Sequence, residues 1–123
     1  MRDKELVLEI LSQIYEATKT VIKRFAPINS VNDFIDSEAG TEKLDAICMQ
    51  LIAIGEGLKN LDKVTNNKLL TRYPQIEWKK VKGMRDIVSH HYFDLDAEVI
   101  YEVCRNHMGP LAETLRQMIR DIS

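Results

Sequence analysis

One short segment of this 123-residue chain gathers the side chains best suited to phosphate chemistry. It reads Arg85-Asp86-Ile87-Val88-Ser89-His90-His91-Tyr92, so a histidine and then a tyrosine follow an arginine within about two helical turns. A guanidinium stays charged and matches the geometry of a phosphate. An imidazole can exchange a proton near neutral pH. The segment therefore combines a fixed cation with a group able to move protons.

The two histidines are expected on different sides of a helix that we place at about residues 75–92. At about 100° per residue, His91 falls on the apolar face. There a core histidine held by one hydrogen bond is a simpler interpretation than a catalytic histidine. His90 points the other way, four residues after Asp86, whose carboxylate could fix its tautomer and favour its protonated form. His90 is thus the better candidate for proton transfer, with a plain surface histidine as the alternative. The expected apolar face comprises Trp78, Val81, Met84, Ile87 and Val88.

Arg85 lies at the border of this apolar face, where an unpaired guanidinium is rare. Its stem could lie on Trp78 while the charged head reaches into a groove. Alternatively, the head could form an ion pair with a carboxylate of another helix, such as Glu56. Tyr92 could act in the same site, or it could simply pack with its hydroxyl at the rim.

A single copy of the segment cannot complete the cleavage of RNA. Attack by a 2′-hydroxyl needs a base, an acid and a cation on the phosphate. Residues five apart, such as Arg85 and His90, point roughly 140° away from each other on a helix. A two-fold dimer that apposes two such helices would supply two histidines and two arginines around one groove. We therefore predict a homodimer.

Charge is distributed unevenly along the chain. The net charge is −2, which does not favour a generic nucleic-acid binder. The stretch from Lys59 to Arg85, however, contains eight basic and only two acidic residues, and the phosphate-handling segment begins at its end. We expect it to guide a polyanion such as RNA, with Lys79 and Lys82 as the guiding residues. The alternative is an ordinary solvated helix face.

A metal site is a third possible interpretation of this region. Two imidazoles and two carboxylates, from His90, His91, Asp94 and Asp96, could hold a divalent ion. Adjacent histidines diverge on a helix, however, and the two aspartates are well explained as helix caps. We therefore expect no metal ion and no other cofactor.

The rest of the sequence predicts an all-α scaffold, an up-and-down bundle of four to five helices in a single domain spanning residues 1–123. Apolar residues recur at helical spacing over residues 4–25, and a short turn of helix is possible at Val31–Phe34. A second helix follows a cap at Asp36-Ser37, and Gly55 and Gly57 within it suggest either close approach of another backbone or a tolerated defect. Residues 62–75 read as a loop that could contain one helical turn, and Gly109-Pro110 should break or kink the last helical region.

Composition places the chain among ordinary globular proteins, with 45% hydrophobic and 29% charged residues. We find neither a membrane-spanning run nor the apolar core of a signal peptide, and we therefore expect a cytoplasmic protein that contacts no membrane. Cys48 and Cys104 lie among apolar neighbours without metal-ligand spacing, which predicts reduced, buried thiols.

Arg85, His90 and Tyr92, at this spacing, resemble the signature of HEPN domains of the HepT toxin type. The likeness extends to Ile54-Gly55-Glu56, and to Trp78 upstream of the arginine. This resemblance implies an all-α bundle that dimerises and cleaves RNA without a metal.

By the same resemblance, Arg85 and His90 would be the catalytic pair and Asp86 would support them. The usual partner in such systems is a small nucleotidyltransferase antitoxin of the MntA type. The motif tyrosine, here Tyr92, would accept adenylyl groups from it and the toxin would be shut off. An alternative is a helical domain that binds a nucleotidyltransferase without catalysis. The extra histidine, His91, departs from the pattern and leaves open which imidazole acts.

Overall fold

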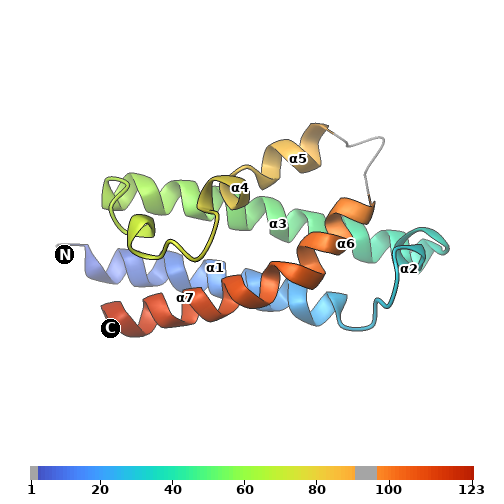
Figure 1. The fold of residues 1–123 in the computed structure, drawn as a ribbon, viewed down its shortest axis with the longest axis horizontal. Helices are drawn as coiled ribbons and strands as arrows, with labels where there is room; N and C mark the ends of the chain where they lie inside the picture. The colour runs from blue at the N-terminus through green and yellow to red at the C-terminus, as the bar shows by residue number, and fades with distance from the viewer. Residues whose placement is uncertain (1–2, 91–96) are drawn as a thin grey trace.

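The computed structural model describes residues 3–90 and 97–123, and all the regular structure in these residues is helical. This confirms the predicted all-α class. Figure 1 labels seven α-helices in this part of the chain, and a short 3₁₀ turn (η1) follows the third. The elements are α1 (Lys4–Phe25), α2 (Asn32–Ile35), α3 (Glu38–Thr65), η1 (Leu70–Arg72), α4 (Trp78–Lys82), α5 (Met84–His90), α6 (Ala97–Asn106) and α7 (Met108–Ile122).

The long helices α1, α3 and α7 form the body of the molecule. Helix α1 packs most extensively on α3 and then on α7. Figure 1 shows α1 along one side of α3, whereas α4 and α5 lie on the other. The short pair α4–α5, which contains the start of the phosphate-handling segment, is thus held on α3.

Apolar stripes of the two longest helices supply a large part of the core, and the shorter helices and α7 add to it. In α3 the buried stripe comprises Leu44, Ile47, Leu51, Ile54, Leu58 and Leu61, and in α1 it comprises Val7, Ile10, Ile14 and Val21. Each such side chain contributes about 1.5–3 kcal/mol when it leaves water. This burial, repeated along two helices, fixes α3 as the platform for the rest of the fold.

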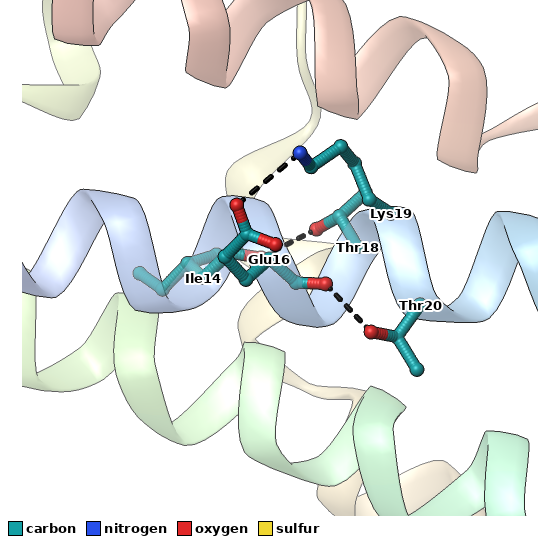
Figure 2. A network of polar contacts seen from close by, with 5 residues as sticks. All are labelled: Ile14, Glu16, Thr18, Lys19 and Thr20. Atoms are coloured by element: carbon teal, nitrogen blue, oxygen red, sulfur yellow. Dashed lines mark hydrogen bonds and ion pairs between the residues drawn. The ribbon is translucent and has the colours of Figure 1, made fainter.

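Helix α1 satisfies its own polar side chains, as Figure 2 shows. The buried Thr18 hydroxyl donates to the carbonyl oxygen of Ile14 at 2.8 Å, and Thr20 donates to the carbonyl of Glu16 at 2.9 Å. An ion pair of 3.2 Å joins Lys19 to Glu16 on the exposed side. The buried threonine therefore leaves no unpaired hydroxyl in the core.

Both ends of α3 carry capping signals. The Ser37 hydroxyl accepts a hydrogen bond of 2.9 Å from the backbone N–H of Gly40, which confirms the predicted cap. At the other end Asn66 and Asn67 have positive φ of 54° and 61°, a conformation that asparagine tolerates better than most residues. The helix ends there and the chain turns back toward α4.

The prediction of one continuous helix over residues 75–92 is wrong. Helix α4 begins only at Trp78, and Gly83, with φ −81° and ψ 3°, separates it from α5. Ile87, expected on the apolar face, is 37% exposed. Trp78, Met84 and Val88 are buried as expected.

The predicted break near Gly109-Pro110 occurs slightly earlier, at His107. Helix α7 then begins at Met108, so Pro110 lies in its first turn, where a missing N–H is tolerated. The short helix predicted at Val31–Phe34 is observed as α2, one residue later.

The two cysteines are free and buried, as predicted. Burial, and to a smaller extent the nearby Asp45 carboxylate, raises the pKa of Cys48 to about 11. Burial also raises the pKa of Cys104 to about 12, with a minor contribution from Cys48. Neither thiol is therefore a ready nucleophile at neutral pH.

Every helix of the described residues is either too short or too polar to cross a membrane.

Candidate functional site

A glycine on α3 sets the position of α4. A β-carbon added to Gly55 would lie 3.2 Å from the carbonyl oxygens of both Val81 and Lys82, closer than most real contacts. The last turn of α4 therefore rests directly on α3, as the glycine predicted. Because α5 starts at Met84, this contact also fixes where the arginine of the motif emerges.

A second anchor holds the start of α4. Trp78 is 9% exposed, and its indole N–H donates to the carbonyl oxygen of Tyr73 at 2.8 Å. Tyr73 in turn donates its phenolic hydroxyl to the Asp121 carboxylate of α7 at 2.7 Å. This chain of contacts ties the loop before α4 to the far end of the bundle. Burial, followed by the hydrogen bond to Asp121, raises the pKa of Tyr73 to about 12.

Arg85 forms the ion pair that the sequence suggested. Its Nη1 lies 3.1 Å from Oε1 of Glu56, and the same oxygen lies 4.0 Å from Nζ of Lys59. The Arg85 side chain is nevertheless 60% exposed and that of Glu56 is 43% exposed. Exposed ion pairs contribute only about 0–1 kcal/mol. A phosphate could therefore replace the carboxylate at small cost.

Helix α5 places Asp86 in its first turn and ends at His90, so these residues lie at neighbouring positions of one helix. In Figure 1 this end of α5 is drawn at the edge of the molecule, away from the bundle. The imidazole of His90 lies outside the described residues. So do His91, the predicted modification site Tyr92, and Asp94 and Asp96 of the alternative metal site.

A groove runs between α3 and α4, directly beside the start of α5. Its volume is about 530 Å³, and it is open to solvent. Four of its eight lining residues are lysines, two from each wall. The lining comprises Lys59, Asp62, Lys63, Asn67, Lys79, Lys82, Gly83 and Asp86.

The two lysines predicted to guide RNA, Lys79 and Lys82, differ in whether a carboxylate already balances their charge. Nζ of Lys82 lies 2.6 Å from Oδ2 of Asp62, and both side chains are largely shielded from solvent. Its charge is therefore balanced within the fold. Lys79 is exposed and, within residues 3–90 and 97–123, it lies in no ion pair.

Sequence reasoning missed that Lys59 and Lys63 share this groove with Lys79. Their spacing of four along α3 was a signal that they share a face. What the spacing could not reveal is that this face borders α4.

The chain is similar to known proteins over most of its length. The family model described as "Ribonuclease HepT-like" matches residues 14–118. "Putative RNase MJ0127" of Methanocaldococcus jannaschii is 32% identical over 119 residues, covering 97% of this chain and 92% of that protein. "Putative RNase TTE0752" of Caldanaerobacter subterraneus is 28% identical over 110 residues, or 89% and 91% of the two chains.

A shorter match covers 54% of this chain and 56% of "Probable ribonuclease HepT" of Thermococcus cleftensis, with 30% identity over 66 residues. No solved structure matches the chain significantly.

Proposed function

Because this chain belongs to the HepT-like ribonuclease family, we propose that it is an endoribonuclease that cleaves RNA without a metal ion. Arg85 and His90 are the catalytic pair, and Asp86 supports the histidine. The observation that carries the proposal is the exposed guanidinium of Arg85 at the start of the same short helix that His90 ends. Relatives over nearly the whole length of the chain are named as RNases, which supports the same reaction.

The reaction is attack of the RNA 2′-hydroxyl on the adjacent phosphorus. His90 accepts the proton of that hydroxyl as the P–O2′ bond forms, and the P–O5′ bond then breaks. Arg85 exchanges Glu56 for the phosphate and stabilises the negative charge that develops on its oxygens. Asp86 orients the imidazole of His90 and favours its protonated form.

The leaving 5′-oxygen needs a proton, and one copy of the chain offers a single acting histidine. In the proposed homodimer, His90 of the second copy supplies it. A strictly monomeric protein with full activity would refute this part of the proposal, and analytical ultracentrifugation beside the cleavage assay decides it.

The same site suggests how the activity is switched off. We assign the protein the role of a cytoplasmic toxin whose partner is a nucleotidyltransferase antitoxin of the MntA type. Adenylyl groups on Tyr92 would bring phosphates next to Arg85 and His90, where they would occupy the position of the RNA phosphate. Mass spectrometry of the protein after incubation with such a transferase and ATP tests this assignment.

The central experiment is incubation of the purified protein with total RNA in excess chelator. The parent protein should cleave, whereas His90→Ala and Arg85→Ala should each lose about 10²–10⁴-fold in rate, the usual contribution of a positioned catalytic group. Undiminished cleavage by His90→Ala would end the assignment. A protein that binds the transferase tightly but cleaves no RNA would instead be a non-catalytic partner.

A further inference from the structure

We propose that the groove between α3 and α4 binds the phosphate backbone of single-stranded RNA beside the cleaved bond. This inference rests on the proposed function and extends it, because it assigns a binding role to Lys59 and Lys63 of α3 together with Lys79 of α4. The cleavage motif would then occupy one end of a longer RNA-binding track.

The two walls of the groove place their lysines opposite each other. Lys59 and Lys63 are one turn apart on α3, and both are exposed. Lys79 stands on α4 across from them, and the contact at Gly55 holds the two helices together. The positive side chains are thus fixed relative to one another by packed backbone, although each amine is free to adjust.

The charges within the groove differ in how far they are already balanced. Lys82 and Asp62 neutralise each other at 2.6 Å. Lys59 is only at the limit of an ion pair with Glu56, at 4.0 Å. Lys63 and Lys79 are in no ion pair among the described residues. Two to three ammonium groups therefore remain for an anion, against the one further carboxylate of the lining, Asp86.

The groove is continuous with the motif. Asp86, which lines the groove, directly follows Arg85, and Lys59 approaches the same Glu56 oxygen that Arg85 binds. A strand whose phosphate replaces Glu56 on Arg85 would meet Lys59 next. An open track of exposed lysines suits a polyanion that is held along its backbone, whereas a small anion would need a closed pocket.

The test compares two neighbouring lysines of α4. Lys79 lines the groove, whereas Lys80 lies outside it and pairs with Glu77 at 3.0 Å. Lys79→Gln and Lys80→Gln change the net charge equally, so a difference between them reports the position of Lys79 and its lack of an ion pair among the described residues, and not the loss of a charge alone. Lys63→Gln tests the opposite wall.

Binding is measured first, in a His90→Ala background that does not consume the RNA. Fluorescence anisotropy with a labelled single-stranded RNA gives Kd at several salt concentrations. Each groove variant should reduce the slope of log Kd against log salt by about 0.7, because one phosphate contact is lost. Over a tenfold rise in salt concentration, the affinity of such a variant should therefore fall about fivefold less than that of the parent. Lys80→Gln should leave the slope unchanged.

Cleavage is measured second, with His90 intact, on a long RNA and on a dinucleotide. The groove variants should lower kcat/KM for the long RNA alone, because a dinucleotide does not reach the groove. If Lys63→Gln and Lys79→Gln match Lys80→Gln while the parent still cleaves RNA, the groove proposal is overturned and the proposed function stands. If the parent neither binds nor cleaves RNA, both fail.

Discussion

The contact between Gly55 and α4 makes a prediction about both stability and activity. Gly55→Ala adds a β-carbon 3.2 Å from two backbone carbonyl oxygens of α4. Backbone atoms cannot swing aside as a side chain can, so α4 must move by a few tenths of an ångström. Gly109→Ala is the matched control, since its β-carbon would meet nothing within 4 Å. Neither glycine has a positive φ, but Gly109 precedes Pro110, whose ring crowds the β-carbon of a preceding residue in the helical conformation.

Two opposing effects set the magnitude. Replacing glycine by alanine inside a helix stabilises it by about 1 kcal/mol. Overpacking against a fixed neighbour costs about 1–3 kcal/mol. Gly55→Ala should therefore range from about neutral to about 2 kcal/mol destabilising. Gly109→Ala should lie between about neutral and about 1 kcal/mol stabilising, because it avoids the overpacking but lies in the first turn of α7 and before Pro110, where alanine gains less.

Chemical denaturation at 25 °C measures the free energy of unfolding of each variant. RNA cleavage by the same preparations reports the position of Arg85, because α5 begins directly after the displaced turn. We expect kcat/KM of Gly55→Ala to fall severalfold, given that a 1 Å misplacement can cost about 10²-fold. Gly109→Ala should retain full activity.

The reasoning fails if Gly55→Ala stabilises the protein by about 1 kcal/mol, the full gain of alanine over glycine in a helix interior. That result would mean that α4 does not rest on α3 at this point. A destabilised Gly55→Ala variant with unchanged kcat/KM would support the packing contact but would refute the inference that this contact positions Arg85.

Three further changes have defined outcomes. Glu56→Gln removes the carboxylate that competes with RNA for Arg85. In a His90→Ala background it should tighten RNA binding by up to about fivefold, because an exposed ion pair is worth at most about 1 kcal/mol. Weaker binding would show that Glu56 positions the guanidinium. Tyr73→Phe should lose about 1.5–3 kcal/mol, the value of a hydrogen bond to a charged acceptor. The pKa of Tyr73 is raised to about 12 in the folded protein, so the extra stability of the parent over Tyr73→Phe should be complete below about pH 10 and should vanish as the pH rises through 12. Thermal unfolding of both proteins across that pH range measures this difference. Ser37→Ala should cost about 1 kcal/mol by removing the cap of α3, and an unchanged urea midpoint would contradict that role.

The long helices were predictable because their signals are redundant. In α1 and α3 the same apolar positions repeat over many turns, and each buried side chain reinforces the same periodicity. Ser37 marked the start of α3 through local chemistry alone, since its hydroxyl bonds a backbone N–H within the same turn. Signals of this kind need no knowledge of the neighbouring elements.

The break at Gly83 could not be predicted in the same way. A glycine costs a helix only about 1 kcal/mol, so it permits a break without requiring one. The start at Trp78 depends on the indole bond to Tyr73, and the end of α4 depends on the contact at Gly55. Both are tertiary contacts, so the pattern of residue types within this segment does not specify them.

In the candidate site, too, residue spacing predicted some features, whereas others depend on how the helices pack on one another. The ion pair of Arg85 with Glu56 could be anticipated because a guanidinium at the border of an apolar face needs a partner. A count of charge along the sequence could not show where the positive excess lies. The two acidic residues that it includes, Glu77 and Asp62, pair with Lys80 and Lys82, so the excess belongs to the other basic residues of the stretch.

What remains of that charge is concentrated by packing. Lys63 and Lys79 are sixteen positions apart in the sequence, yet they line one groove because Gly55 lets α4 lie on α3. The field that an RNA strand meets depends on this convergence, and it falls off within about 10 Å at 0.1 M salt. The glycine that positions Arg85 therefore also assembles the lysines of the groove, and the effects of Gly55→Ala and Lys79→Gln on the cleavage of long RNA should not be additive.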